Sequence, residues 1–499
     1  MTEHSVNVRG LALETLLAVM EDGGQSHFVI RETLDAHPEL TQQEKSFYRR
    51  LTAGTIACAL QLDYILDTFS SVRTKKMKPA IREIMRMAVF QFLYMDAVPD
   101  AAAVNEAVKL TRKFGFRGLT GFVNGVLRAV SRGIGGVKYP SMAEDPVRSL
   151  EIRYSMPSYL VKKWIDEFGT ETTEQICRGF MEKRPVTVRL RGPRAEELAR
   201  MYHREEERRR PSENAVADGT ETKAVDNGSE NSASGAQVSR LENSTSGTAD
   251  NGRDVRKAPY VPDAWYMENA GNLAALSEFR NGSVIVQDVS SQMAVRAAGI
   301  RPGDTILDVC AAPGGKSILA ADLTGPEGHV RSCDISEKRA ARIVENIKRC
   351  RLENVDVVVR DARKIDDFPA NVVICDAPCT GYGDIGRKPE IRYRASEENI
   401  RELVSLQREI LRASVSHVRP GGTLLFSTCT FGHRENQDSF LWLQEEFGLQ
   451  PVDLTERIPA EVAALPGVRE TAAQGYVQLL PGCAKCDGFF FGVLTRPEA

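Results

Sequence analysis

The sequence lacks the features of a secreted or membrane protein. Its first ten residues, MTEHSVNVRG, contain neither a basic start nor the apolar stretch of a signal peptide. No uninterrupted apolar run approaches the roughly 20 residues that span a membrane. Ten cysteines in 499 residues, several inside apolar strand-like segments, indicate reduced thiols rather than a disulfide framework. These absences predict a soluble, cytoplasmic protein.

The chain also lacks two other kinds of signal. Its net charge is -3, so no global basicity announces a nucleic-acid partner, although local patches can still bind one. Its histidines show no ligand spacing, and Cys483-Ala-Lys-Cys486 is a lone CxxC without a second ligand pair, so we expect no metal. What remains is an ordinary globular composition, with 42% hydrophobic and 27% charged residues, long enough for two to four domains.

Residues 1–135 are predicted to form a small all-helical domain. Apolar residues recur at helical spacing in residues 10–20, 47–66, 79–94, 101–112 and 121–130. Two segments, 73–78 and 112–138, carry basic residues without any acid. They can be solvated helix ends or a face that contacts phosphates, and the pattern alone leaves both open.

Residues 136–281 are predicted to form a small α/β domain. The segment 156–168 has the pattern of an amphipathic helix, and 185–190 that of a strand. Between 203 and 258 there is no aromatic residue, and small polar and acidic residues dominate. Such a segment buries too little apolar surface to offset its ordering entropy, so we predict a disordered insertion over 203–258.

Residues 282–499 alternate apolar strand-like runs with helical stretches. The strand candidates are 305–310, 329–334, 355–360, 372–376 and 422–427, and the helix candidates are 316–323, 337–349 and 398–418. This alternation predicts a Rossmann-like, doubly wound and mostly parallel sheet. Ligands of such sheets bind beyond the carboxyl ends of the strands.

The first strand leads into a loop of small residues that ends in a lysine. Its small residues let the backbone approach a ligand, and a helix N-terminus follows. It is not a phosphate loop, because a cysteine stands where GxxxxGK[ST] has its first glycine. The next two strands end near Asp334, suited to a ribose diol, and Asp361, suited to an adenine amine. Acids without a phosphate loop favour S-adenosylmethionine, which is cationic at sulfur, and the predicted loop is Cys310, Ala311, Ala312, Pro313, Gly314, Gly315 and Lys316.

Two cysteines follow the fourth and fifth strands. The fourth ends in Asp376-Ala377-Pro378-Cys379 and the fifth in Ser427-Thr428-Cys429, so both thiols should emerge at the same edge of the sheet, beside the cofactor. Most free cysteines are small buried hydrophobes. We accept that interpretation for Cys310, Cys333, Cys350 and Cys375. It fits Cys379 and Cys429 poorly, because both lie just past a strand at the edge where ligands bind.

A thiol beside a methyl donor indicates chemistry at a pyrimidine carbon. Carbon-5 of a pyrimidine is a poor nucleophile, but a thiolate added to carbon-6 makes it enamine-like, so that it can attack a methylsulfonium. The thiol must ionise, which requires a pKa below its usual value of about 8.5. Asp376 could hydrogen-bond the cytosine edge, and Lys316 could polarise the base.

These motifs resemble the Sun/RsmB family of bacterial small-subunit ribosomal RNA cytosine-5 methyltransferases. The resemblance covers nearly the whole chain outside the insertion. In the helical part, similar to the antitermination factor NusB, it rests on residues 98–108 and 122–128. Elsewhere it rests on Gln287-Asp288-Val289-Ser290-Ser291, 310–316, 376–380, Gly386-Arg387-Lys388-Pro389-Glu390, 427–430 and 487–490.

The resemblance implies the roles of the site residues. Cys429 is implied to be the nucleophile and Cys379 to help release the product, while residues 310–316, Asp334, Asp361 and Asp376 are implied to contact the cofactor. It also implies 16S rRNA as the partner, naked or in an early assembly intermediate, and a monomer is expected. His433-Arg434-Glu435-Asn436 departs from the common Glu-Glu-Asn run. Another RNA target, or a non-catalytic RNA-binding factor, remains an alternative.

Overall fold

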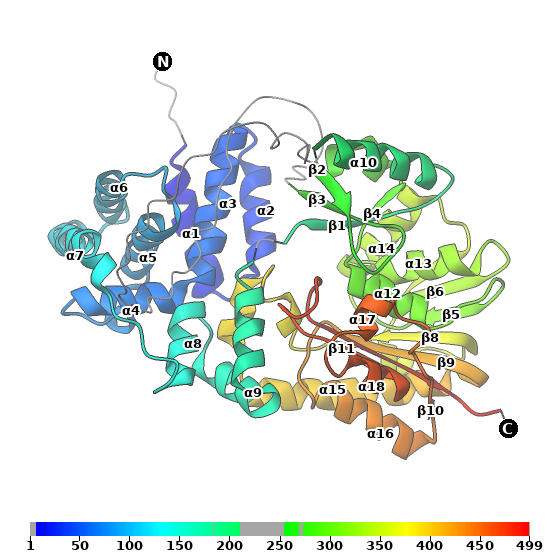
Figure 1. The fold of residues 1–499 in the computed structure, drawn as a ribbon. Coiled ribbons are helices and arrows are strands. Elements are labelled where there is room, and N and C mark those ends of the chain that lie inside the picture. Colours follow the sequence, from blue (N-terminus) through cyan, green and yellow to red (C-terminus); the bar gives the residue numbers. More distant parts are fainter. Residues whose placement is uncertain (1–5, 183, 210–253, 269–272, 499) are drawn as a thin grey trace, which may run out of the picture. The chain divides into compact units, whose positions relative to one another are not determined.

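The computed structural model describes residues 6–182, 184–209, 254–268 and 273–498. They divide into two compact units (Figure 1). The larger unit comprises Met1–Arg184, Pro259–Val261 and Gln287–Ala499, and the smaller unit comprises Pro185–Ala258 and Pro262–Val286. Each unit has its own core and is described by itself.

The larger unit begins with a helical part that buries one contiguous apolar core. Its helices are α1 Val8–Met20, α2 Ser26–Ala36, α3 Gln42–Ala57, α4 Ala59–Phe69, α5 Pro79–Tyr94, α6 Asp100–Lys113 and α7 Thr120–Gly133. The all-helical prediction is confirmed. The helix α2 was not predicted from the apolar spacing.

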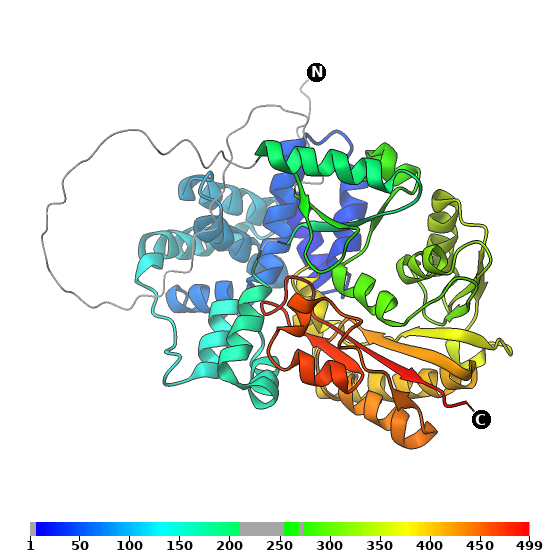
Figure 2. The ribbon, with the colours of Figure 1, turned by 45° about the vertical axis from the view of Figure 1, so that its right-hand side comes forward.

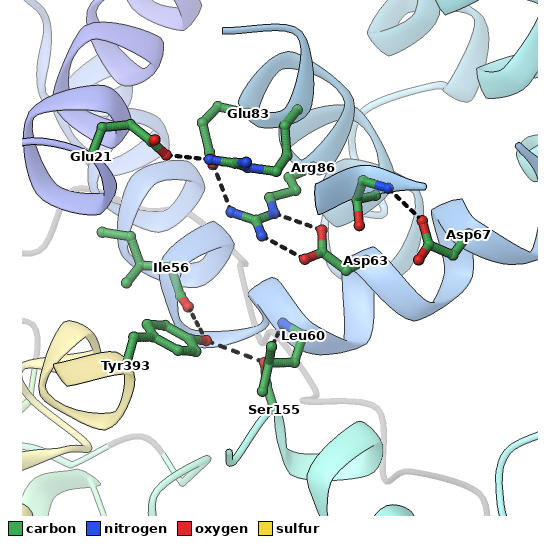
Figure 3. Close-up of polar contacts among 11 residues, drawn as sticks. Glu21, Ile56, Leu60, Asp63, Asp67, Glu83, Arg86, Ser155 and Tyr393 are labelled. Atoms are coloured by element: carbon green, nitrogen blue, oxygen red, sulfur yellow. Dashed lines mark hydrogen bonds and ion pairs between the residues drawn. The ribbon is translucent and has the colours of Figure 1, made fainter. Parts of the chain in front are cut away.

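One predicted helix, 47–66, is two helices that meet at Cys58. The break is stabilised by partners from distant segments. The carbonyl of Ile56 accepts a hydrogen bond from the Tyr393 hydroxyl at 2.7 Å, and the amide of Leu60 donates to Ser155 Oγ at 2.8 Å (Figure 3). Because these partners are far away in the sequence, apolar spacing alone predicts an uninterrupted helix.

Two further helices, α8 Pro146–Tyr154 and α9 Ser158–Gly179, follow the helical part. The predicted helix 156–168 is the first half of α9. The helix continues beyond a kink at Gly169, whose φ of 79° lies in the region that favours glycine. Trp164 of α9 is fully buried in a separate apolar cluster.

The second half of the larger unit is a mixed sheet with the order β10-β12-β9-β8-β5-β6-β7, and β11 pairs with β12. Strands β5 to β9 are parallel to one another, whereas β12 pairs antiparallel with β9, β10 and β11. The prediction of a mostly parallel, doubly wound sheet is confirmed. The strands are β5 Thr305–Asp308, β6 His329–Asp334, β7 Val355–Val359, β8 Ala370–Asp376, β9 Val418–Thr428, β10 Gln450–Pro451, β11 Tyr476–Leu479 and β12 Phe489–Thr495.

Helices cover both faces of this sheet (Figures 1 and 2). One layer consists of α12 Val289–Ala297, α13 Gly315–Thr324 and α14 Glu337–Cys350. The other layer contains α15 Glu397–Ser416 and α16 Gln437–Phe447. The short helices α17 Ala460–Ala463 and α18 Val468–Ala473 pack against each other, and α18 contacts β11. Strand β5 lies between β6 and β8. The chain continues from β5 to β6 and β7 on one side and then crosses to β8 on the other side, so the strand order reverses at β5. Ligands of doubly wound sheets bind at this switch point.

A short 3₁₀ segment, η7 Pro389–Arg394, joins the sheet half to the helical part within the larger unit. Ser26 donates from its amide and its hydroxyl to the Glu390 carboxylate, at 2.9 and 2.6 Å. The fully buried guanidinium of Arg392 donates to the Ala57 carbonyl at 3.0 Å. These contacts attach the end of α3 and the start of α2 to a segment that follows the predicted catalytic loop.

The smaller unit is a four-stranded antiparallel sheet with the order β2-β3-β1-β4. Its strands are β1 Val186–Leu190, β2 Asp254–Lys257, β3 Ala264–Glu268 and β4 Val284–Val286. Helix α10 Ala195–Arg209 packs against it through Leu198 and Tyr202, and α11 Ser277–Arg280 precedes β4.

The prediction of disorder over 203–258 is wrong at both edges. Residues 203–209 continue α10, and 254–257 form β2, whose Val255 pairs with Met267 and is buried. The Arg- and Glu-rich end of α10 consists of good helix formers, and β2 is held by its partner strand. The remaining predicted insertion, 210–253, lies outside the described residues.

Candidate active site

The loop after β5 connects the switch point to α13. Asp308 ends β5 and is fully buried, and it accepts a hydrogen bond from the Ser317 hydroxyl at 2.7 Å. Burial raises the pKa of Asp308 to about 7. Gly314, with a φ of 101°, is the N-cap of α13, and a Cβ there would lie 3.1 Å from Ile343 Cγ2. Glycine is therefore required at Gly314 for both its backbone conformation and its packing.

The two predicted nucleoside-binding acids lie on successive strands, but their surroundings differ. Asp334 ends β6, is nearly fully buried, and accepts hydrogen bonds from the Ala312 and Ser336 amides at 3.4 and 3.0 Å. Its contact with Ala312 links it to the loop 310–316. Asp334 also forms an ion pair with Arg339, at 3.1 Å. Asp361, which follows β7, pairs with Arg363 at 2.7 Å, and this hydrogen bond lowers the pKa of Asp361 to about 2. An adenine amine would have to share that carboxylate with the guanidinium.

Lys316 and Asp376, predicted on separate loops, meet at the same edge of the sheet. Lys316 Nζ lies 2.7 Å from Asp376 Oδ2 and 5.3 Å from the centroid of the Phe489 ring. The other carboxylate oxygen, Asp376 Oδ1, accepts from the Ser427 hydroxyl at 2.7 Å. Side chains from the start of α13 and from β9 thus orient the carboxylate that ends β8, which is fixed at both oxygens.

The two predicted catalytic cysteines are in direct contact. Cys379 Sγ and Cys429 Sγ lie 3.4 Å apart, although the residues are 50 positions apart in the sequence. The hydrogen bond between the two sulfurs, followed by burial, raises the pKa of Cys379 well above its usual value. The contact places the two sulfurs where a proton can be shared between them.

Three of the cysteines assigned to the core are buried, as predicted. Cys333, Cys350 and Cys375 are at most 5% exposed. Cys310 is only partly exposed and packs at the edge of the sheet core. Burial raises the pKa of Cys310 well above its usual value, which makes it an unreactive thiol in the loop wall.

Sequence reasoning missed a charged cluster that joins three of the family motifs. Arg387 Nε lies 2.7 Å from Asp487 Oδ2, and Arg387 Nη2 lies 3.7 Å from Asp288 Oδ2. Arg184 also reaches Asp487, at 3.3 Å. Arg387, Asp288 and Asp487 each belong to a quoted motif, whereas Arg184 does not, and which motifs meet depends on the fold of the loops.

Sequence reasoning also missed the polar side chains behind the two cysteines. Thr380 and Thr430, which directly follow the cysteines, share a hydrogen bond of 2.9 Å between their hydroxyl oxygens. Glu435, only 1% exposed, accepts two further hydrogen bonds from Thr380. Asn436 accepts from the Thr428 hydroxyl at 2.6 Å. The only sequence signal was the position of the Glu435-Asn436 pair shortly after Cys429.

The described part of the chain contains no group of three or more His, Cys, Asp or Glu side chains placed to hold a metal ion. All ten cysteines lie in that part, and each is a free thiol. None of its helices combines the length and apolar character needed to cross a membrane.

Comparisons with known proteins match both halves of the larger unit. A family model described as 16S rRNA methyltransferase RsmB/F matches residues 297–495, and the NusB family model matches residues 6–132. The probable ribosomal RNA small subunit methyltransferase B of Bacillus subtilis (strain 168) is 32% identical over 493 residues, with 97% of each chain covered. The chain belongs to this Sun/RsmB family. The ribosomal RNA small subunit methyltransferase B of Cronobacter sakazakii is 28% identical and covers 99% of each chain.

Solved structures with low sequence identity share the fold. The crystal structure of PH0851 has a TM-score of 0.72 at 23% identity and covers 99% of each chain. The structure of NSun6 from Pyrococcus horikoshii with the S-adenosylmethionine analogue SFG has a TM-score of 0.52 at 18% identity, covering 69% of this chain and 99% of that one.

Family membership makes the protein a methyltransferase that uses S-adenosylmethionine. The residues at the switch point fit that cofactor. Gly314 is the N-cap of α13 at the switch point, and the carboxylates of Asp334 and Asp376 suit a ligand that carries a sulfonium, an ammonium and a ribose diol.

Proposed function

We propose that the protein methylates carbon-5 of a cytosine in 16S ribosomal RNA, with Cys429 as the nucleophile and Cys379 as the group that assists product release. The contact between the two thiols carries this proposal. Their sulfurs lie 3.4 Å apart, at the same edge of the sheet as the Lys316–Asp376 pair. Methylation of a nitrogen or an oxygen needs positioning or a base, but no pair of thiols.

A thiol solves the problem that carbon-5 is a poor nucleophile. The Cys429 thiolate forms a bond to carbon-6, and the electron pair of the 5,6 double bond becomes available at carbon-5. S-adenosylmethionine would supply an electrophilic methyl group, which carbon-5 would accept as the sulfonium–methyl bond breaks and S-adenosylhomocysteine leaves. A base then removes the carbon-5 proton, the double bond re-forms, the sulfur–carbon bond breaks, and the thiolate leaves. Cys379 holds its proton beside Cys429, where it can assist this last step.

Asp376 and Lys316 are the residues that we propose to bind the cytosine. The Asp376 carboxylate is fixed by Lys316 and Ser427, which suits an acceptor for the amino edge of the base. The Lys316 ammonium beside it can polarise the base as carbon-6 is attacked. Both act at the position where the substrate ring must meet Cys429.

The cofactor is proposed to contact the loop of residues 310–316, together with Asp334, Asp361 and Asp376. The loop backbone and the N-terminus of α13 face the switch point. Asp334 is the acid best placed for the ribose, because it is buried and bonded to the loop at Ala312. Each acid already pairs with a guanidinium, Asp334 with Arg339 and Asp361 with Arg363, so a bound nucleoside would share both carboxylates with an arginine.

The RNA is proposed to contact the NusB-like domain, residues 1–135, and the small α/β domain, while the sheet half of the larger unit carries the chemistry. The small α/β domain was predicted over 136–281, but the smaller unit comprises Pro185–Ala258 and Pro262–Val286, and residues 136–184 belong to the larger unit. In the NusB-like domain, the basic side chains of the two segments are exposed. Exposed cations can bind phosphates without selecting a sequence. The side chains available are Arg73, Lys75, Lys76, Lys78, Arg112, Lys113, Arg117, Arg128 and Arg132.

Transfer of a tritiated methyl group to deproteinised RNA tests this function. We expect 16S rRNA to be labelled, and bisulfite sequencing to place the label at one cytosine. Labelling of transfer RNA or large-subunit rRNA instead would refute the proposed substrate. Labelling of 16S rRNA at a nitrogen or an oxygen would refute the proposed chemistry.

A further inference from the structure

The loops that carry the two cysteines are cross-linked by one buried carboxylate. Thr380 follows Cys379 on one loop, whereas Glu435 belongs to the segment that follows Cys429. Glu435 Oε1 accepts from the Thr380 amide at 2.7 Å, and Glu435 Oε2 accepts from the Thr380 hydroxyl at 2.8 Å. Two charge-assisted hydrogen bonds thus hold the residue next to one thiol to the segment of the other.

The hydrogens in this cluster have one consistent direction. Because the Thr380 hydroxyl donates to Glu435, its oxygen is left to accept from the Thr430 hydroxyl, 2.9 Å away. The donors therefore run from Thr430 through Thr380 to Glu435, which ends the chain as a carboxylate acceptor. This chain of hydrogen bonds connects the two cysteine loops through Thr380 and Thr430, the residues that directly follow Cys379 and Cys429.

The surroundings of Glu435 allow a buried carboxylate. Burial raises its pKa, while the hydrogen bonds from Thr380 and the charge of Lys163 oppose the rise. Lys163 is itself paired with Glu167 at 2.6 Å. The neighbouring Asn436 donates to the Thr430 carbonyl at 3.1 Å and so fixes the same segment from its other side.

We propose that Glu435 is a positioning residue that sets the distance between Cys379 and Cys429, and thereby the step in which the product is released. It grips the Cys379 loop directly, through two bonds, and reaches the Cys429 loop only through Thr430. Loss of its carboxylate should therefore displace Cys379 more than Cys429. The consequence for release rests on the proposed function, whereas the geometric role does not.

Cross-linking of the two thiols measures their distance without any RNA. Diamide oxidises two thiols to a disulfide and is itself reduced to the hydrazine, and mass spectrometry of the full-length protein quantifies the Cys379–Cys429 linkage. Glu435→Ala should slow this linkage about ten-fold or more, since a misplacement of about 1 Å can cost on the order of a hundred-fold in a positioned reaction. A linkage rate equal to that of the unsubstituted protein would overturn the proposal.

Two conservative variants separate the hydrogen bonds from other roles of the carboxylate. Glu435→Gln keeps an acceptor for the Thr380 amide, and its NH2 group can donate to the Thr380 hydroxyl once that chain reverses, so linkage should stay within about three-fold of the unsubstituted protein. An effect as large as that of alanine would overturn the hydrogen-bond account. Thr380→Val removes only the hydroxyl bonds and should give an intermediate rate. If Glu435→Ala does not fold, Thr380→Val tests the positioning role in its place. An unchanged rate of Cys379–Cys429 linkage in Thr380→Val would then refute the proposal.

A matched control comes from Glu83 in the helical part, which is also 1% exposed. Glu83→Ala removes a buried carboxylate far along the chain from both cysteines, and linkage should be unchanged. With RNA and cofactor, Glu435→Ala should accumulate a covalent protein–RNA adduct and lose turnover about ten-fold. If no variant forms an adduct but linkage still slows in Glu435→Ala, the proposed function fails and the positioning role stands.

Discussion

Replacement of Arg392 by methionine should loosen the attachment of the helical part within the larger unit. The Arg392 side chain is 1% exposed, and its Nη1 donates to the carbonyls of Ala57, Tyr154 and Ser155 at 3.0, 3.2 and 3.4 Å. Ala57 and Tyr154 end α3 and α8. The cation therefore lies at two helix C-termini, where the helix dipole favours positive charge.

The magnitude follows from the number and kind of these bonds. A hydrogen bond from a charged donor is worth about 1.5–3 kcal/mol net, but the three bonds share one nitrogen, and removal of a buried charge recovers part of its desolvation penalty. We therefore expect a loss of about 3 kcal/mol for Arg392→Met. At about 1.4 kcal/mol per factor of ten, local opening at the junction becomes on the order of a hundred-fold more frequent.

Native-state hydrogen exchange measured by mass spectrometry detects this change locally. Peptides that cover residues 50–60 and 148–156 should exchange on the order of a hundred-fold faster in Arg392→Met, whereas those from β5 to β9 should not change. Arg394→Met is the control, because Arg394 is exposed and donates to the Gly24 carbonyl at 2.6 Å; its effect should stay near the α1–α2 turn. Exchange in residues 50–60 within two-fold of the unsubstituted protein would refute the reasoning.

Three further predictions concern the candidate active site. Lys316→Met removes the cation that holds Asp376 and should lower the rate of methyl transfer about 100-fold in single-turnover assays, while circular dichroism should show intact folding. A rate within three-fold of that of the unsubstituted protein would contradict the proposed role of Lys316. Burial raises the pKa of Asp308 to about 7, so between about pH 4 and 7 the folded state binds a proton that the unfolded state has lost. The contribution of Asp308 to stability is therefore complete below about pH 4 and is lost as the pH rises to 7. In urea unfolding of the cofactor-free protein, the unsubstituted chain should lose about 2 kcal/mol more than Asp308→Asn between pH 5.5 and 8, and parallel pH profiles would contradict this. Cys379→Ala should accumulate a protein–RNA adduct on denaturing gels, and free turnover would remove its proposed role in release.

Local patterns were sufficient to predict several elements and the position of both cysteines. The predicted strand 329–334 and helix 79–94 match β6 and α5. The helix α5 has apolar residues at helical spacing and a proline in its first turn. The doubly wound order also explains why Cys379 and Cys429, each just past a parallel strand, meet at one edge.

Features that depend on distant partners could not be predicted in this way. The break at Cys58 is stabilised by Tyr393, more than 300 residues later in the chain. Glu435 lies 55 residues from Thr380, and nothing in the local pattern distinguishes a buried acceptor from a solvated acid. The edges of the predicted insertion form regular elements because Val255 and Tyr202 are buried by a sheet whose strands are far apart in the sequence.

Nucleoside analysis of 16S rRNA after reaction with S-adenosylmethionine and either the unsubstituted protein or Cys429→Ala tests the central claim most directly. The contact between the Cys429 and Cys379 thiols predicts 5-methylcytosine from the unsubstituted protein and none from Cys429→Ala, which should also form no covalent adduct. Equal amounts of 5-methylcytosine from both proteins would contradict the account, because carbon-5 would then be methylated without the thiol.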